Sequence, residues 1–405
     1  MKMDKEAYYR PTCAEVNVSA LRHNIQAFRS ALPVATKLSL CVKANAYGHG
    51  AIEVARVAEE EGVDYLNVAF LDEAIQLRNA GISIPILVLG YTPPEGIPSA
   101  YFHNITLTVF SYEVLEKLEE AGNHLCVENG GRQLKVHVKM DSGMGRLGLC
   151  SAEELTAYVA RLRAIDGVQV EGVFTHFACA DEQDKSYTEL QHKRFEAAVQ
   201  VLIESKQLPP IVHTSNSAAA IDLSAYHHDM VRVGISLYGL YPSKEVNHQR
   251  IKLEPVLAWK TQVVHVKKMK AHEAISYGAR YKTEQDEWIA TLPVGYADGY
   301  SRLLGGKVDV LIRGIRVPVV GTICMDQCMI SLSPLGELAR EIHTGEEVIL
   351  VGRQGDECIA IAELADHMGT IHYEVACMLA HRLPRVYVES GHLRTIHNPL
   401  IMEPK

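Results

Sequence analysis

Lys43 is the first residue of the chain whose type and position could do chemistry. It directly follows the mostly apolar residues 37–42, and the next segment holds two glycines, Gly48 and Gly50, before a helix-forming stretch. A lysine amine at the end of a buried strand can form a Schiff base with the aldehyde of a cofactor. A lone lysine at a strand end is otherwise a solvated surface charge, so the rest of the fold must decide between the two interpretations.

Other polar residues also stand at the ends of apolar runs. Because the reactive groups of a (β/α)8 barrel lie at the C-terminal ends of its strands, we expect these residues to meet at one rim. Alternation along residues 230–235 turns Val231 and Val233 toward the helical shell and Arg232 toward the interior, where a guanidinium needs a partner. The residues of this set are Lys139, Arg146, His176, Asn216, Ser217, Arg232 and Gly234.

The elements that must position these residues are short apolar runs that alternate with amphipathic stretches. One such stretch follows Ser111, a favourable N-cap, and places Val114, Leu115 and Leu118 on one face. Eight strands alternating with helices predict an α/β fold, with an N-terminal (β/α)8 barrel of the TIM type; a doubly wound open sheet is the main alternative. The expected strands are residues 37–42, 65–70, 86–89, 105–109, 134–140, 169–175, 211–213 and 230–235.

A change of pattern near residue 253 predicts a second, mostly β domain. Four apolar runs follow one another there through glycine-rich turns, at residues 256–266, 288–294, 308–320 and 348–351. Helical patterns interrupt them only at residues 359–368 and near 375–380. We therefore expect a barrel over residues 1–252 and a mostly β C-terminal domain over residues 253–405. No helix precedes residues 12–18, so residues 1–18 belong to the barrel or associate with the β domain.

Composition excludes several classes of function. The 405 residues are 47% hydrophobic and 22% charged, as in ordinary globular proteins. The net charge of −9 gives no electrostatic reason to bind nucleic acid. Charged N-terminal residues and the lack of a long apolar run predict no signal peptide, no membrane segment and a cytoplasmic location. The nine cysteines include no Cys-x-x-Cys, and the histidines, with His227 and His228 among them, show no ligand spacing, so we expect neither disulfides nor a metal.

Eight segments, in order along the chain, resemble the motifs of the bacterial alanine racemase family, which uses pyridoxal 5'-phosphate (PLP) on a barrel-plus-β fold. The most specific is VKANAYGHGA (residues 42–51), which is similar to the family's PLP-lysine motif. The others are KMDSGMGRLG (139–148), HTSNSAA (213–219), VRVGISLYG (231–239), SYGA (276–279), PVGYADGY (293–300), CMDQ (324–327) and YEV (373–375). Small departures occur at Cys13, where relatives often have Trp, and at Ser215, where Ala is common. Neither touches the chemistry.

The resemblance implies the catalytic residues. Racemisation removes the α-hydrogen from one face of a planar carbon and returns a hydrogen to the other, so two acid/base groups on opposite faces suit it. The resemblance assigns these roles to Lys43 and Tyr277. A free tyrosine has a pKa of about 10 and needs a positive field to act near neutrality. His176 and Arg232 match the histidine and arginine that supply this field in the family.

The resemblance also implies the binding residues. The substrate is expected to contact Arg146, Tyr296 and the backbone amide of Met325. Lys139 matches a lysine that is carbamylated (N6-carboxylysine) in many relatives, where it orients the arginine matched by Arg146; a simple ion pair with Asp141 is the alternative. PLP is expected to contact Lys43, Tyr47, Arg146, His176, Asn216, Ser217, Arg232, Gly234, Ile235 and Tyr373.

The activity that the resemblance implies is interconversion of L- and D-alanine, which supplies D-alanine for peptidoglycan. The family forms head-to-tail homodimers, in which the partner subunit supplies the residues matched by Tyr277, Tyr296 and Met325. A serine-preferring or broad-specificity racemase is the nearest alternative, although Tyr373 argues against a serine enzyme because specialised relatives carry a smaller polar residue there. A PLP-dependent decarboxylase usually has a glycine-rich phosphate loop, which is absent here. A non-catalytic PLP carrier typically lacks the β domain.

Overall fold

The computed structural model describes residues 8–401, which pack into two compact units. Residues 20–46 together with 51–255 form one, here called the barrel unit. The other, the β unit, contains residues 8–19, the short segment Tyr47–Gly50 and residues 256–401. The predicted boundary between residues 252 and 253 stays a prediction; the contacts also add these two earlier segments to the β unit.

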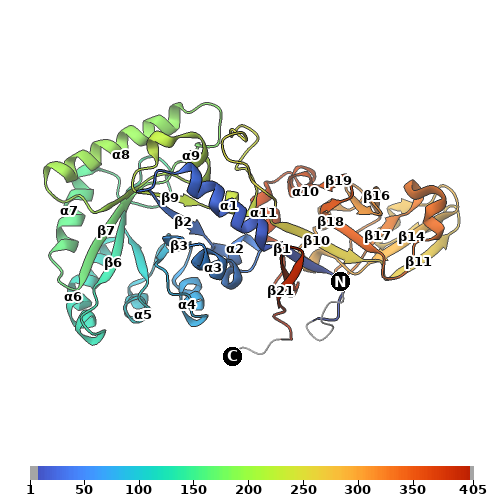
Figure 1. The fold of residues 1–405 in the computed structure, drawn as a ribbon, viewed down its shortest axis with the longest axis horizontal. Helices are drawn as coiled ribbons and strands as arrows, with labels where there is room; N and C mark the ends of the chain where they lie inside the picture. Colours follow the sequence, from blue (N-terminus) through green and yellow to red (C-terminus); the bar gives the residue numbers. More distant parts are fainter. Residues whose placement is uncertain (1–7, 402–405) are drawn as a thin grey trace. The chain divides into compact units, whose positions relative to one another are not determined.

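The barrel unit is built on eight parallel strands in the order β8-β7-β6-β5-β4-β3-β2-β9, inside a layer of helices (Figure 1). Between β8 and β9 two backbone hydrogen bonds take the place of a ladder, from Asp229 N to Val212 O and from Arg232 N to Ser215 O, both 3.0 Å. The predicted barrel and its eight strands are therefore confirmed. The strands are β2 (Lys37–Cys41), β3 (Tyr65–Val68), β4 (Ile86–Val88), β5 (Thr106–Val109), β6 (Leu134–Lys139), β7 (Val168–Phe174), β8 (Ile211–His213) and β9 (Met230–Val233).

The helices of this layer bury one apolar face each. In α6 this face is Val114, Leu115 and Leu118, as the sequence pattern predicts. Ser111 is at the N-cap of α6 but makes no capping hydrogen bond, whereas Ser151 caps α7 by accepting from Glu154 N at 3.1 Å. The helices are α1 (Val18–Ala31), α3 (Ala51–Glu60), α4 (Leu71–Asn79), α5 (Ile97–His103), α6 (Tyr112–Glu128), α7 (Ala152–Arg163), α8 (Ser186–Glu204) and α9 (Ser217–Asp222).

The segment α2 (Lys43–Tyr47) is a turn of left-handed helix. Ala44, Asn45 and Ala46 have φ of 52°, 53° and 54°, and Tyr47 has φ of 50°. A left-handed helix costs about 1–2 kcal/mol per non-glycine residue, so this turn is strained. Local hydrogen bonds hold it: Glu73 Oε1 accepts from Ala44 N at 2.7 Å, and Asn45 Oδ1 accepts from Ala51 N at 2.9 Å. The helix expected after Lys43 begins only at Ala51, once this turn is complete.

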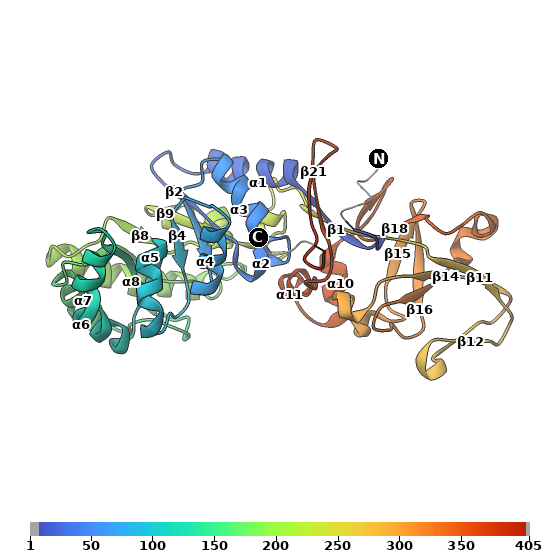
Figure 2. The same ribbon diagram turned by 90° about the horizontal axis from the view of Figure 1, so that it is seen from below.

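The β unit is dominated by one long sheet, with strand order β11-β14-β17-β16-β15-β18-β10-β1-β20-β21 and β19 added to β18. The small β12–β13 hairpin lies at the tip of a loop that extends from this sheet (Figure 2). The strands are β1 (Cys13–Asn17), β10 (Leu257–Gln262), β11 (His265–Met269), β12 (Ala274–Ile275), β13 (Tyr281–Lys282), β14 (Glu287–Leu292), β15 (Asp309–Ile312), β16 (Ile315–Val320), β17 (Cys328–Ser331), β18 (Glu347–Gln354), β19 (Glu357–Ile359), β20 (Arg385–Glu389) and β21 (His392–His397). The helices α10 (Ile361–Met368) and α11 (His372–Cys377) interrupt it near the predicted positions.

Two details of the β unit differ from the sequence pattern or extend it. The single run predicted at residues 308–320 is a hairpin, because Arg313 and Gly314 adopt φ of 51° and 75° and reverse the chain in two residues. The N-terminal strand β1 pairs antiparallel with β10 and parallel with β20. It therefore lies inside the sheet of the β unit.

All nine cysteines are free thiols. Within residues 8–401, no helix combines the length and apolar character needed to cross a bilayer.

Candidate active site

Arg232, in β9, is the centre of a buried polar cluster in the barrel unit. Only 2% of its surface is exposed. Nη1 donates to His213 Nδ1 at 2.7 Å, and Nη2 lies 3.3 Å from His176 Nδ1. Nη2 also donates to the backbone oxygens of Thr175 and Thr214, at 2.8 and 2.9 Å. The guanidinium therefore lies at the C-terminal ends of β7 and β8, where the chemistry of such a barrel is expected.

A chain of hydrogen bonds runs from Arg232 through two histidines to a carboxylate. Because a guanidinium can only donate, His213 Nδ1 accepts and its proton sits on Nε2. His213 Nε2 lies 2.8 Å from His137 Nδ1, and His137 Nε2 lies 3.3 Å from Glu171 Oε2. Each neutral ring thus accepts at Nδ1 and donates at Nε2. The chain thus links the Arg232 guanidinium to the Glu171 carboxylate, which also forms an ion pair with Lys135.

Glu171 is held from several sides. Its carboxylate accepts a hydrogen bond from Lys135 Nζ at 2.6 Å and another from the Tyr65 hydroxyl. The next residue, Gly172, leaves space for the ring of His137, since a Cβ there would lie 2.4 Å from Nδ1. Glu171, His137 and His213 were given no role by sequence reasoning. The available signal was alternation in residues 134–140, which puts Lys135 and His137 on the face of Lys139.

The environment of this chain sets which groups are charged. Burial first, and then the charge of Arg232, hold the pKa of His176 and of His213 well below the usual value. Burial also lowers the pKa of His137, although Glu171 opposes it. Burial alone would raise the pKa of Glu171, but its hydrogen bonds outweigh that effect and bring it to about 2. Burial lowers the pKa of Arg232 to about 10, so it stays protonated at neutral pH.

Lys139, at the end of β6, is a buried amine among positive charges. It is 4% exposed, and its Nζ lies 4.8 Å from the ring centre of Phe174. Burial, followed by the charges of Arg232 and Arg146, lowers its pKa to about 7. Within residues 8–401 no ion pair joins Lys139 to Asp141. The alternative prediction for Lys139, a simple ion pair with Asp141, is therefore not met. Lys43 also contributes to this lowering, so the predicted cationic residues of the barrel unit lie close together.

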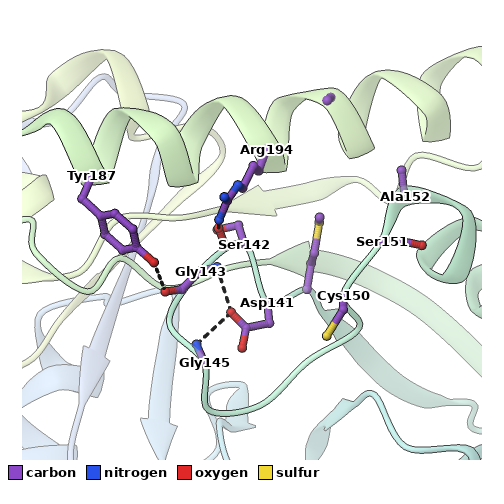
Figure 3. A pocket seen from close by; sticks show the side chains of 11 residues that line it. Asp141, Ser142, Gly143, Gly145, Cys150, Ser151, Ala152, Tyr187 and Arg194 are labelled. Carbon is purple, nitrogen blue, oxygen red and sulfur yellow. Dashed lines mark hydrogen bonds between the residues drawn. The ribbon is translucent and has the colours of Figure 1, made fainter.

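Hydrogen bonds inside the loop that carries Arg146, and one from α8, hold its backbone in place (Figure 3). Asp141 accepts from the backbone N–H groups of Gly143, Gly145 and Arg146 at 2.9–3.1 Å, and this pattern rather than an ion pair lowers its pKa against the effect of burial. From α8, the Tyr187 hydroxyl donates to Gly143 O at 2.7 Å. A pocket of about 650 Å³ is lined by this loop and by residues of α8. The exposed Arg146 is thus presented by a fixed backbone.

Ser217, Asn216 and Gly234 form a cradle at the ends of β8 and β9. Gly234 N donates to Ser217 Oγ at 2.8 Å, which leaves the hydroxyl hydrogen for an anion such as a phosphate. Asn216 caps α9, because its Oδ1 accepts from Ala219 N at 3.1 Å. Ile235 follows Gly234 and starts a 3-10 turn, η3 (Ile235–Tyr238). Hydroxyl and backbone N–H donors of this kind fit a phosphate group.

The remaining predicted residues belong to the β unit, where three of them share one pocket. Tyr277, Tyr296 and Met325 line a pocket of about 750 Å³. All three are exposed, to 72%, 43% and 53%. Tyr296 N donates to Cys324 O at 3.1 Å, and Thr322 Oγ1 donates to Tyr277 O at 2.9 Å. Backbone bonds therefore place these side chains, while the side chains themselves face outward.

Asp298 organises the turn that follows Tyr296. Its carboxylate is fully buried and forms ion pairs with Arg10 at 2.6 Å and Arg382 at 2.8 Å. It also accepts from Gly295 N at 3.1 Å. Arg382 bonds in addition to Asp326 at 2.7 Å, next to Met325. One buried carboxylate thus supports both sides of the pocket.

Tyr47 and Tyr373, the last two predicted residues, lie together in the β unit. Their ring centres are 6.3 Å apart. Gly48 and Gly50 let the backbone after Tyr47 approach the rest of the unit, because a Cβ on Gly48 would lie 2.2 Å from Ala376 O and one on Gly50 would lie 1.8 Å from the Tyr387 hydroxyl. The glycines of the lysine motif are therefore required by packing.

Comparison with known proteins identifies the family. The family model described as the alanine racemase N-terminal domain matches residues 16–242, and that of the alanine racemase C-terminal domain matches residues 256–387. Among curated relatives, alanine racemase 1 of Clostridium acetobutylicum is 42% identical over 96% of this chain and 99% of its own length, and the alanine racemase of Desulforamulus reducens is 45% identical over 93% and 99%. The crystal structure of alanine racemase from Bacillus anthracis with bound L-Ala-P superposes with a TM-score of 0.89, at 41% identity, over 97% of this chain and 99% of that one. The chain belongs to the alanine racemase family.

Proposed function

We propose that this protein interconverts L-alanine and D-alanine with PLP as its cofactor. The observation that carries the proposal is family membership over almost the whole chain, with each predicted motif of the barrel unit at the C-terminal end of a strand. D-alanine made in this way would supply peptidoglycan synthesis in the cytoplasm.

The residues present fit PLP. The cradle of Ser217 and the Gly234 amide suits its phosphate, with Asn216, Ile235, Tyr47 and Tyr373 as further contacts. In our proposal the Lys43 amine would bind its aldehyde carbon, Arg232 would face its ring nitrogen, and Arg146 would contact its phenolic oxygen. When bound, PLP withdraws electrons from the α-carbon of the substrate and makes the α-hydrogen acidic.

Two side chains would move the proton. Lys43 and Tyr277 would act on opposite faces of the α-carbon, one removing a proton and the other returning one. His176 accepts from Arg232 at Nδ1, so its Nε2–H is available to donate toward the oxygen of Tyr277 and stabilise its anionic form. Arg232, fixed by four acceptors, would keep His176 in this tautomer.

Arg146 and the Met325 amide would bind the substrate carboxylate, and Tyr296 would limit the size of the side chain admitted. We infer that Lys139 carries a carbamate. A neutral amine adds to carbon dioxide with loss of one proton, and a pKa of about 7 makes the neutral form abundant at physiological pH. The resulting anion would orient Arg146 and offset the surrounding positive charges.

A head-to-tail homodimer would complete each site. The exposure of Tyr277, Tyr296 and Met325 supports a role for them toward a partner subunit. Mixing inactive Lys43→Ala and Tyr277→Phe chains tests this sharing: heterodimers should contain one intact site and regain activity. No recovery after demonstrated subunit exchange would contradict it.

The decisive test of the activity is a racemisation assay on alanine with and without added PLP. We expect the highest kcat/KM for alanine when serine, lysine and arginine are compared. Lys43→Ala should lose both turnover and the visible absorbance of bound PLP. A preference for another amino acid, or PLP binding without turnover, would contradict the proposal.

A further inference from the structure

Three side chains on the outside of the barrel unit face one another with metal-ligand chemistry. His192 and Glu196 lie one turn apart on α8, and His228 lies in the loop that leads into β9. His192 Nε2 is 3.3 Å from His228 Nε2. Glu196 Oε1 is 3.8 Å from His192 Nε2 and 3.6 Å from His228 Nε2. His228 is 36 residues from His192 in the sequence, which explains why no metal-ligand spacing is visible there.

The three distances match a divalent metal ion of zinc size. A point equidistant from the three atoms lies about 2.1 Å from each, within the ~2.0–2.2 Å of zinc–nitrogen and zinc–carboxylate bonds. An ion slightly out of that plane would keep normal bonds and leave open positions for water. Imidazole is a good ligand for zinc, copper and nickel, whereas magnesium and calcium favour sites made of oxygen ligands alone. Two imidazoles and one carboxylate therefore favour a transition-metal ion.

The chemistry of the three groups is suited to an ion. Within residues 8–401 the Oε1 atom of Glu196 is buried without a hydrogen-bond partner, which is costly for a carboxylate oxygen, although the side chain as a whole is 44% exposed. The two histidines face each other through Nε2, so at most one of those nitrogens can carry a proton for the other to accept. His228 also holds a strained φ of 49°, which is uncommon for a residue other than glycine.

The cluster is connected to the loop that precedes the cradle. The ring of His192 stacks on Tyr226, with centres 3.8 Å apart. Tyr226 O accepts hydrogen bonds from the hydroxyls of Thr214 and Ser215, at 2.7 and 2.8 Å. These residues directly precede Asn216 and Ser217. An ion held here would therefore fasten α8 to the segment that fixes the cradle.

We propose that His192 Nε2, His228 Nε2 and Glu196 Oε1 bind one divalent transition-metal ion, with zinc as the expected occupant. The ion is structural: it joins α8 to the loop before β9 and takes no part in proton transfer.

Metal titration of the PLP-loaded enzyme tests the site. After treatment with a chelator, the wild type should bind one equivalent of Zn2+ by calorimetry, and Co2+ in its place should give visible absorption. His228→Gln and Glu196→Gln should weaken that equivalent by more than about tenfold. His124 and Glu128 on α6 form a matched control, since they repeat the spacing at 3.0 Å without a second histidine. His124→Gln should leave metal binding unchanged.

Stability and activity separate a structural ion from other roles. Zn2+ should raise the melting temperature of the wild type and of His124→Gln but not of Glu196→Gln. The racemisation rate of Glu196→Gln at moderate temperature should match that of the wild type. Because Glu196 is on the protein surface, its substitution tests the site even where His228→Gln folds poorly. Equal Zn2+ affinity in wild type and Glu196→Gln, or an equal loss in His124→Gln, would overturn the proposal.

Discussion

Replacement of Glu171 by Gln should destabilise the protein in a manner that depends on pH. Glu171 ends the hydrogen-bond chain from Arg232, and its carboxylate is held by His137, Lys135 and Tyr65. The amide of Gln keeps the shape of this side chain but removes the negative charge that those donors require. Lys135 would then lose its ion-pair partner, and His137 would lose the carboxylate that faces its Nε2.

The pKa of Glu171 gives the size of the effect. The folded value is about 2, compared with an ordinary value of 4.5, which corresponds to an upper limit of about 3 kcal/mol. Lys135 is partly exposed, so salt screens its share of this energy. Because the folded pKa is the lower one, the stabilisation is complete above pH 4.5 and is lost as pH falls toward 2. Between pH 6 and 3.5 the wild type should lose roughly 1–1.5 kcal/mol at this residue.

Urea unfolding at fixed protein and PLP concentrations measures this difference. The free energy of unfolding of Glu171→Gln should lie below that of the wild type by about 2–3 kcal/mol at pH 7, and the gap should narrow at pH 3.5. Glu128→Gln, an exposed substitution, should change stability by less than about 0.5 kcal/mol. A gap that stays constant or widens as pH falls would refute the reasoning.

Three further substitutions test other parts of the structure. In buffer free of carbon dioxide, where Lys139 is a free amine, Lys139→Met should stabilise the PLP-free chain by a few kcal/mol at pH 7, and it should abolish racemisation. The folded pKa of this amine, about 7, is below the ordinary 10.5, so wild-type stability in that buffer should rise from pH 7 to 10. A flat wild-type profile in urea unfolding would contradict this. Ser217→Ala should leave the Gly234 amide without its acceptor and lower the free energy of unfolding by about 1–3 kcal/mol. It should also weaken PLP binding by about tenfold or more. An unchanged PLP titration would exclude Ser217 from the cradle. Asp298→Asn should lower the free energy of unfolding by about 2–5 kcal/mol, because Arg10 and Arg382 lose their buried ion-pair partner. It should also raise the KM for alanine, because the turn that carries Tyr296 loses its support. A lower melting temperature with unchanged KM would limit Asp298 to a structural role.

The barrel strands were predictable because each is a short, buried apolar run, and the polar residue after each run marks the C-terminal rim. Lys43 and Arg232 could be placed on this basis alone. The left-handed turn after Lys43 could not, because Ala44 and Ala46 have no intrinsic preference for positive φ and adopt it only under tertiary constraint. The hydrogen-bond chain that leads from Arg232 to Glu171 was hidden, since His213, His137 and Glu171 come from three strands whose order in space the local sequence does not contain.

The pairing of β1 has a consequence for synthesis on the ribosome. Residues 13–17 are synthesised well before their neighbours in the sheet, which are residues 257–262 and 385–389. At ~5–20 residues per second, the strand waits roughly 20–70 s for β20 to be made. All eight barrel strands are synthesised during that interval. The nascent chain must therefore keep an apolar strand out of non-native pairings until its last partner emerges, and a chain truncated before β20 would leave β1 with one open edge.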